Sequence, residues 1–137
     1  MALTRLVDTS VLTRLGEPAI REAIEPGAQR AELARAEISD LEVGFSVRNA
    51  AEWDRLADGV EAFELVQSTA EHVRRAKQVQ RLLAAKHQRG RKVPDLLIAA
   101  AAEACGLTVL HYDADFDLIA SVTGQPCEWV VPAGSVD

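Results

Sequence analysis

Residues 107–120 have the sequence LTVLHYDADFDLIA. The apolar, partly β-branched residues 107–110 predict a short buried strand. Asp113, Asp115 and Asp117 follow that strand directly, although two carboxylates about 4 Å apart repel each other by roughly 1 kcal/mol even in water. Such a cluster beside a buried strand indicates a bound cation or a positively charged partner. The alternative is a solvated helix N-terminus, where aspartate is favoured in any case.

The rest of the chain alternates between short strands and helices. Strands are predicted over 3–7, 33–38, 63–67 and 127–131, and helical segments over 11–15, 18–25, 39–44, 49–62, 69–90 and 94–105. This alternation is typical of an α/β domain with a mostly parallel central sheet and helices on both faces. Residues 1–137 are therefore expected to form a single domain, in which 133–137 are a short tail.

The composition is that of an ordinary soluble globular protein, with 48% apolar and 26% charged residues. No apolar run approaches the length of a membrane span, and the N-terminus lacks the pattern of a secretion signal. Cys105 and Cys127 have no metal-ligand spacing, so we expect reduced core thiols in a cytoplasmic protein. The three histidines are scattered in sequence, which argues against a zinc site.

The charges are unevenly distributed along the chain. The net charge is −6, yet residues 72–94 contain no acidic residue and carry a charge of +8, which leaves −14 for the remainder. Because a nucleic-acid backbone responds to the local field, this basic segment could bind a polyanion despite the acidic total. A solvated helix face is the alternative, and the position of the segment directly before Asp95 favours the first interpretation.

Four acidic residues are expected at one edge of the sheet. Asp8 and Asp113 each follow a predicted strand, whereas Glu42 and Asp95 each lie at the start of a predicted helix. In a parallel sheet the carboxyl ends of strands and the following helix N-termini share one edge, so these side chains can converge. Structural alternatives exist for three of them, since Asp8 and Asp95 could be helix caps and Glu42 could complete a capping box with Ser39.

A cluster of carboxylates without histidine or cysteine is a hard-oxygen site, which favours Mg²⁺ or Mn²⁺. Such ions activate water and stabilise the leaving oxygen in phosphodiester hydrolysis. Two other sites with closely spaced aspartates are excluded. An EF-hand loop needs Gly and Glu where this chain has Leu118 and Gly124. A phosphatase of the haloacid dehalogenase type has its Asp-x-Asp early in the chain, followed by Thr or Val, whereas here Phe116 follows.

Four motifs in order resemble those of a known family over almost the full length. They are LVDTSVL at 6–12, ISDLEVG at 38–44, PDLLIAA at 94–100 and HYDADF at 111–116. With these motifs the chain resembles the PIN-domain ribonucleases and, among them, the VapC toxins of type II toxin–antitoxin pairs. The resemblance implies a PIN fold and Mg²⁺- or Mn²⁺-dependent endonucleolytic cleavage of RNA, leaving a 5′-phosphate and a 3′-hydroxyl.

The resemblance also implies roles for individual residues. It places Asp8, Glu42, Asp95 and Asp113 in the catalytic metal site, with Asp115 as a fifth ligand. Ser10 lies where the family often has a small hydroxyl beside the first acid, and His111 replaces a common Thr or Ser, which we expect to adjust the surroundings of the ligands. Asp117 matches no essential position and is interpreted as a solvated helix residue. From the basic segment, we expect Arg89, Arg91 and Lys92 to contact RNA.

The same resemblance also predicts the binding partners of the protein. It implies a homodimer and a cognate VapB-type antitoxin that lays an apolar helix over a groove. Trp53 and Leu56 are candidate contacts in this groove, and packing in the core is the alternative for each. The alternative hypothesis is a PIN-like module that binds RNA or a protein without cutting.

Overall fold

The computed structural model describes residues 2–88 and 92–137. Its centre is a five-stranded sheet in the order β3-β2-β1-β4-β5, and every neighbouring pair of strands is parallel. The strands are β1 (Arg5–Val7), β2 (Leu33–Ala36), β3 (Glu64–Val66), β4 (Thr108–His111) and β5 (Cys127–Trp129). The predicted α/β class and parallel sheet are confirmed.

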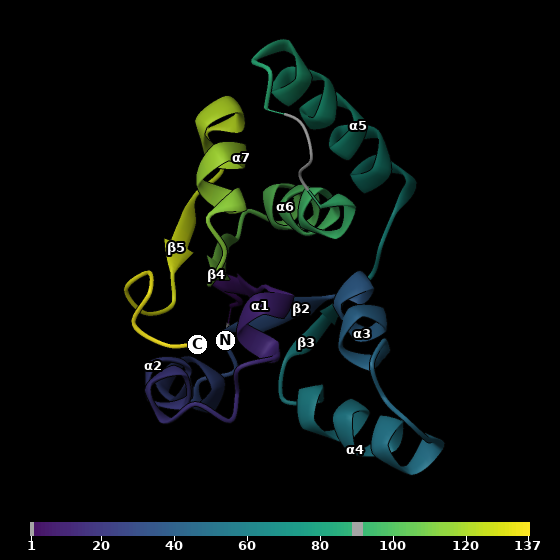
Figure 1. Cartoon of the computed structure of the whole chain (residues 1–137), viewed down its shortest axis with the longest axis vertical. Coiled ribbons are helices and arrows are strands. Elements are labelled where there is room, and N and C mark those ends of the chain that lie inside the picture. Colours follow the sequence, from purple (N-terminus) through teal and green to yellow (C-terminus); the bar gives the residue numbers. More distant parts are fainter. Residues whose placement is uncertain (1, 89–91) are drawn as a thin grey trace.

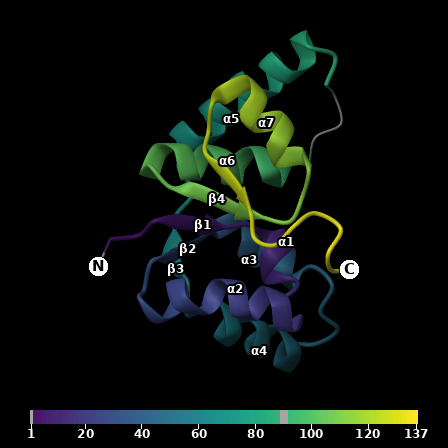
Figure 2. The same cartoon turned by 90° about the vertical axis from the view of Figure 1, so that its left-hand side faces the viewer.

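Helices cover both faces of this sheet (Figures 1 and 2). The helices are α1 (Thr9–Leu12), α2 (Pro18–Gln29), α3 (Glu37–Gly44), α4 (Ala50–Val60), α5 (Ala70–Ala85), α6 (Val93–Cys105) and α7 (Asp115–Thr123). Helices α5, α6 and α7 lie on one face, and α2 and α4 lie on the other. Helices α1 and α3 follow β1 and β2 directly, so both begin at the carboxyl edge of the sheet.

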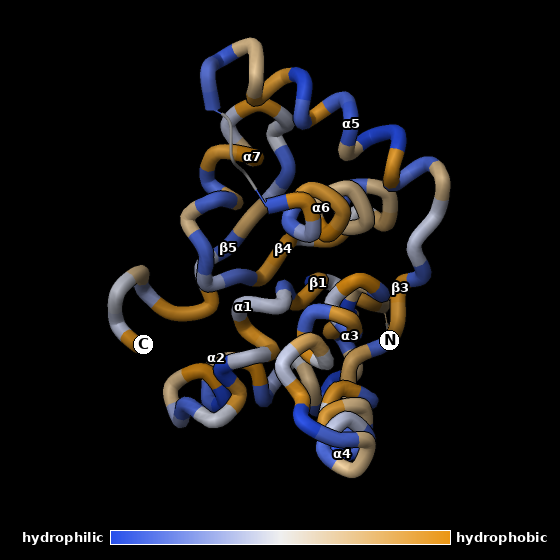
Figure 3. The backbone as a smooth tube through the Cα atoms, turned by 45° about the vertical axis from the view of Figure 1, so that its right-hand side comes forward, coloured by the Kyte–Doolittle hydropathy of each residue, from blue (hydrophilic) through white to orange (hydrophobic). Residues whose placement is uncertain are grey.

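The two faces carry separate apolar cores because side chains alternate along each strand. Leu6 and Val109 pack with Phe116 beneath α5, α6 and α7, whereas Val7 and Leu110 pack with residues of α1, α2 and α4. Helix α6 is hydrophobic almost throughout, while hydrophobic and hydrophilic residues alternate along α5 (Figure 3). Helix α6 is accordingly enclosed between the sheet and α5, and it carries one buried carboxylate, Asp95, at its start.

The predicted bounds of three helices are wrong. The segment predicted over 11–15 is α1, which begins at Thr9 and ends at Leu12. Pro26-Gly27 do not end α2, which continues to Gln29 with Pro26 inside it. The proline removes one backbone hydrogen bond, but Gly27 lets Leu33 pack closely, since a Cβ atom there would lie 3.0 Å from Leu33 Cδ2. Helix α5 begins after its predicted cap, Thr69, but ends at Ala85 rather than near 89–90, because His87 adopts a positive φ of 59°.

The alternative of a capping box at residues 39–42 is also wrong. Strand β2 ends at Ala36, and α3 begins at Glu37 with Ala36 as its N-cap. Ser39 is therefore inside the helix and fully buried, and Glu42 lies in the second turn rather than the first.

The expectation that both cysteines lie in the core is wrong, because Cys105, the last residue of α6, is exposed, and Cys127, the first residue of β5, is only half-buried.

Within the described ranges, no helix is both long enough and apolar enough to cross a membrane.

Candidate active site

The carboxyl ends of β1 and β4 open into a cleft of about 490 Å³. Four of the predicted acids line it: Asp8 after β1, Glu42 on α3, Asp95 at the start of α6 and Asp113 after β4. Segments far apart in the sequence therefore bring their carboxylates to one place, as the parallel sheet predicts.

Asp8 is held rigidly at the end of β1. It caps α1, and its Oδ2 accepts hydrogen bonds from Ser10 N at 2.9 Å and from Ser10 Oγ at 2.5 Å. The Ser10 hydroxyl in turn accepts a hydrogen bond from Tyr112 N at 2.8 Å, which ties α1 to the end of β4. Burial raises the pKa of Asp8 to about 6, although the hydrogen bonds from Ser10 oppose the shift. Ser10 thus lies beside the first acid, at the position expected from the sequence.

Asp95 is the second buried carboxylate, with only 4% of its surface exposed. Lys92 is the N-cap of α6, and Val93, Pro94 and Asp95 form its first turn, where the helix N-terminus favours a negative charge. Proline suits this turn because the first N–H groups of a helix have no partner within it. The carboxylate of Asp95 therefore lies where the buried helix meets the cleft.

Burial dominates the electrostatics of Asp95 despite its place in the first turn of α6. Together with the charges of Asp8 and Asp113, burial raises the pKa of Asp95 to about 8, although Lys92 opposes the shift. The surface-cap alternative for Asp95 is therefore wrong, because this side chain is enclosed among other acids.

Asp113 and Asp115 extend the acidic cluster on the β4 side. Asp113 Oδ2 accepts a hydrogen bond from Lys92 Nζ at 2.6 Å, and Asp113 Oδ1 accepts one from Asp115 N at 2.9 Å. Burial alone would raise the pKa of Asp113, but these hydrogen bonds and the charge of Lys92 outweigh it and hold the pKa below its ordinary value. One carboxylate oxygen from each of Asp95, Asp113 and Asp115 lies within 4.8 Å of the others.

Glu42 reaches the cleft through a contact that the sequence does not predict. Its Oε1 lies 2.6 Å from Thr9 Oγ1, whose hydroxyl donates to the carboxylate. Thr9 also contacts the buried Ser39 hydroxyl at 2.8 Å, so the start of α1 is joined to the middle of α3. The sequence offers only one signal for such a role, which is the position of Thr9 between Asp8 and Ser10.

His111 supports the loop that carries Asp113. Its ring is fully buried, with the centroids of the Phe116 and Trp129 rings each 5.0 Å away. Its Nδ1 accepts a hydrogen bond from Asp113 N at 3.2 Å, and burial lowers the pKa of the imidazole. His111 therefore acts as a neutral hydrogen-bond acceptor behind the cleft.

Of the three residues expected to contact RNA, Arg89 and Arg91 lie outside the described residues. Lys92 lines the cleft, with its ammonium group on Asp113. Asp117 is exposed in the first turn of α7, which agrees with its interpretation as a solvated helix residue.

The donor set fits a divalent cation. Among the described residues, Asp8 Oδ1 and Asp95 Oδ2 are buried oxygens without a hydrogen-bond partner. A buried carboxylate is costly unless it is paired or binds a metal ion, and oxygen ligands of this kind suit Mg²⁺ or Mn²⁺. Of the predicted ligands, Asp95, Asp113 and Asp115 lie close enough together to share a hard cation, while Asp8 and Glu42 line the same cleft outside that group.

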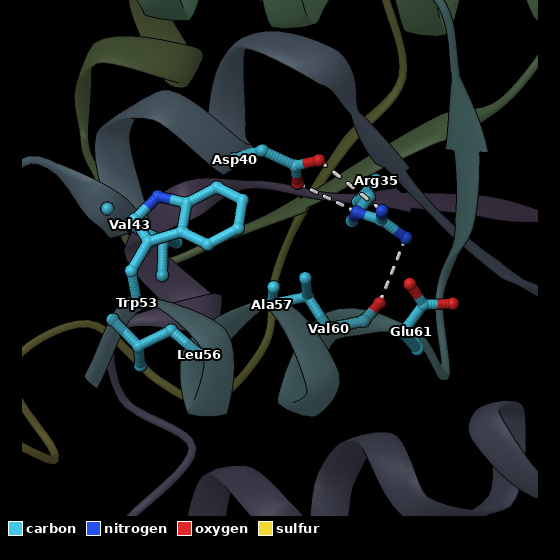
Figure 4. Close-up of a pocket in the computed structure, with 9 residues that line it drawn as sticks. Arg35, Asp40, Val43, Trp53, Leu56, Ala57, Val60 and Glu61 are labelled. Atoms are coloured by element: carbon cyan, nitrogen blue, oxygen red, sulfur yellow. Dashed lines mark hydrogen bonds and ion pairs between the residues drawn. The ribbon is translucent and has the colours of Figure 1, made fainter. Parts of the chain in front are cut away.

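A second pocket, of about 160 Å³, lies between α3 and α4 (Figure 4). Trp53 and Leu56 line it, and a largely buried ion pair between Arg35 Nε and Asp40 Oδ1, 2.8 Å long, lies beside them. Trp53 packs against Gly44, where a Cβ atom would lie 2.7 Å from the indole nitrogen. The two candidate groove contacts thus line a real, partly apolar hollow.

The sequence pattern of the PIN domain family matches residues 5–122, which include every acid of the cleft. The chain belongs to the PIN-domain family. This PIN domain is 64% identical to the protein named Ribonuclease VapC51 from Mycobacterium tuberculosis, over the full length of both chains. It is 42% identical to Ribonuclease VapC21 from the same species, over 98% of this chain and 99% of that protein. The predicted resemblance to VapC-type PIN domains is confirmed.

Solved structures agree on the fold of the PIN domain. The crystal structure of VapBC2 from Rickettsia felis, bound to a DNA fragment from its promoter, has a chain that superimposes with a TM-score of 0.77. The match covers 94% of this chain and 99% of that chain at 17% sequence identity. At this identity the likeness concerns the fold alone.

Proposed function

We propose that this PIN domain is the toxin of a toxin–antitoxin pair and an endoribonuclease, which hydrolyses RNA phosphodiester bonds with metal-activated water. The observation that carries the proposal is the pair of buried oxygens of Asp8 and Asp95, which have no hydrogen-bond partner in the described structure, in a cleft that Glu42 and Asp113 also line and that Asp115 adjoins. The names of its VapC relatives, which are ribonucleases, support the same reaction.

Asp8, Glu42, Asp95, Asp113 and Asp115 would hold Mg²⁺ or Mn²⁺. Such an ion supplies a nucleophilic water and stabilises the leaving oxygen. The side chains around it have separate tasks: Ser10 fixes Asp8, and Thr9 fixes Glu42. Lys92 offsets part of the negative charge at Asp113, which lowers the repulsion that an approaching phosphate meets.

The proposal includes the location and the partners of the protein. We propose that it acts in the cytoplasm as a homodimer and is inhibited by a VapB-type antitoxin, whose apolar helix would cover the pocket of Trp53 and Leu56. Residues 1–137 would form one domain. The last residues pack on the rest of it, because Tyr112 Oη donates a hydrogen bond to Val136 O at 2.7 Å and accepts one from Val136 N at 3.0 Å.

The deciding experiment is the incubation of total cellular RNA with the purified, antitoxin-free protein in Mg²⁺, in Mn²⁺ and in EDTA, followed by mapping of new 5′ ends. We expect cuts at a few discrete sites that require the metal ion and leave 5′-phosphates. If metal-loaded protein binds RNA but produces no new ends, the non-cleaving module is the correct alternative.

A further inference from the structure

Arg14 is a basic residue of the acidic cleft whose hydrogen bonds in the described structure go to none of the proposed metal ligands. It follows α1 and lines the same cleft as Asp8 and Asp95. Unlike Lys92, whose ammonium group donates to Asp113, Arg14 donates its hydrogen bonds to main-chain oxygens. The cleft therefore contains a guanidinium group whose charge is not directed at one of the site acids.

The guanidinium group is held in place from three sides. Its Nη1 donates to Ser10 O at 2.7 Å, its Nε donates to Asp137 O at 2.8 Å, and its carbon lies 4.9 Å from the centre of the Tyr112 ring. An arginine has five N–H donors in a rigid fork, and these contacts within the described structure use two of them. The remaining donors are available for another acceptor.

A phosphate group is the acceptor that fits this arrangement. Planar guanidinium groups bind phosphate oxygens through paired hydrogen bonds, and a fixed group loses little entropy on binding. A polyanion that enters a cleft lined with acids also needs cations beside them.

Resting on the proposed ribonuclease function, we propose that Arg14 binds a backbone phosphate of the RNA next to the one that is cut. Ser10 and Tyr112 contact Arg14, and Ser10 also holds Asp8, so they fix the distance between this phosphate and the acidic cluster. Arg14 thereby sets the register of the strand in the cleft.

A purely structural role, in which Arg14 only holds the C-terminal residues in place, accounts for fewer of these contacts. Two hydrogen bonds between Tyr112 Oη and the main chain of Val136 already anchor that segment. The two roles also differ in a measurable way, because only a phosphate contact contributes to the salt dependence of RNA binding.

The test compares Arg14→Gln, which removes the charge, with Arg14→Lys, which keeps it. Arg55→Gln is the matched control, because Arg55 is exposed on α4 and does not line the cleft. Binding of a fluorescein-labelled, mixed-sequence single-stranded RNA is measured by anisotropy at several salt concentrations, in an Asp95→Asn background with Mg²⁺. Cleavage kinetics are measured without the Asp95 substitution.

We expect Arg14→Gln to weaken binding roughly tenfold and to reduce the slope of log K against log salt by about 0.7, the value for one phosphate of a single strand. Arg14→Lys should keep the slope, and Arg55→Gln should change neither quantity. In cleavage, Arg14→Gln should raise KM more than it lowers kcat.

An unchanged salt slope in Arg14→Gln would overturn the inference, even if the variant were less stable. The proposed function is judged separately, by whether the unsubstituted protein cuts RNA. If it does not cut, but Arg14→Gln still flattens the slope, the phosphate contact stands and the ribonuclease proposal fails.

Discussion

Asp8 and Asp95 are the residues on which the proposed chemistry depends most directly. Replacing either with asparagine keeps the shape of the side chain and removes its charge. We expect cleavage to fall by about 10²-fold or more, on the scale seen when one stabilising group is lost from an active site, while the circular dichroism spectrum stays unchanged. Asp117→Asn is the control, because Asp117 is exposed on α7 outside the cleft. Full activity in Asp8→Asn or Asp95→Asn would remove that residue from the site.

The raised pKa values of the same two residues predict how stability depends on pH. The pKa is about 6 for Asp8 and about 8 for Asp95 in the folded protein, against an ordinary value of 3.8. Between about pH 4 and pH 8 the folded protein therefore binds more protons than the unfolded chain, so the free energy of unfolding falls as pH rises.

In EDTA, we expect denaturant unfolding to show this decline, on the order of a few kcal/mol across the window. Asp95→Asn should flatten the decline above about pH 6 and should leave, between about pH 4 and pH 6, only the part that Asp8 causes. Mn²⁺ should reduce this fall in the free energy of unfolding, because a bound cation offsets the negative charge of both carboxylates. A metal-free protein whose stability does not change across this range would show that neither carboxyl is perturbed.

Single residues of the site are predictable where the local sequence is unusual. Each of the five acids follows a predicted strand or lies near the start of a predicted helix, and Asp95 precedes an uncharged run, although Glu42 proves to lie in the second turn of α3. The contact of Thr9 with Glu42 is not predictable in this way, because the two are 33 residues apart and only the folded chain brings them together.

At the scale of the elements, the link between α1 and α3 depends on Thr9. Thr9→Val keeps the volume of the side chain but removes the hydroxyl that donates to Glu42 and contacts Ser39. We expect a loss of about 1–3 kcal/mol of stability, typical of a lost hydrogen bond to a charged group, and a roughly tenfold lower kcat on the same reasoning. Thr13→Val is the matched control, since the Thr13 hydroxyl makes a weaker, 3.4 Å contact with Ser10 O.

Activity equal to that of the unsubstituted protein in Thr9→Val would show that Glu42 needs no such support. A higher Mn²⁺ concentration should restore part of the lost activity, because Glu42 is present but less well placed. A defect in folding alone would not respond to the metal ion.

Element boundaries are harder to predict than the elements themselves. The capping-box pattern of Ser39 and Glu42 is local, but the strand before it ends at Ala36, and the helix starts there without a side-chain cap. Similarly, the pair Pro26-Gly27 taken alone favours the end of a helix. In the structure α2 continues through this pair to Gln29, and Gly27 packs against Leu33. In both cases tertiary contacts outweigh the local preference.

For the molecule as a whole, the alternation of strands and helices is sufficient to predict a parallel sheet with two covered faces. The order β3-β2-β1-β4-β5 is not predicted, because the short apolar strands are too alike for their composition to specify their neighbours. The order matters for function, since it places β1 beside β4 and so brings Asp8 close to Asp113.

The segregation of charge is the property of the whole molecule that bears most on RNA binding. Lys77 and Arg81 are exposed on α5, which packs on α6, and α6 begins at the cleft. Lys92 is a poor test of the basic segment, because its ammonium group also hydrogen-bonds Asp113. Reversing both α5 charges, Lys77→Glu with Arg81→Glu, leaves the cleft itself unchanged.

We expect this double variant to bind single-stranded RNA more weakly, with a slope of log K against log salt that is smaller by about 1. The control is Arg30→Glu with Arg55→Glu, which changes the net charge equally on the opposite side of the sheet, where both residues are exposed. Because net charge alone would affect both double variants alike, a larger effect on α5 identifies that helix as part of the path of the RNA. Equal effects would mean that the basic segment acts only through the total charge, and that the cleft binds its substrate without it.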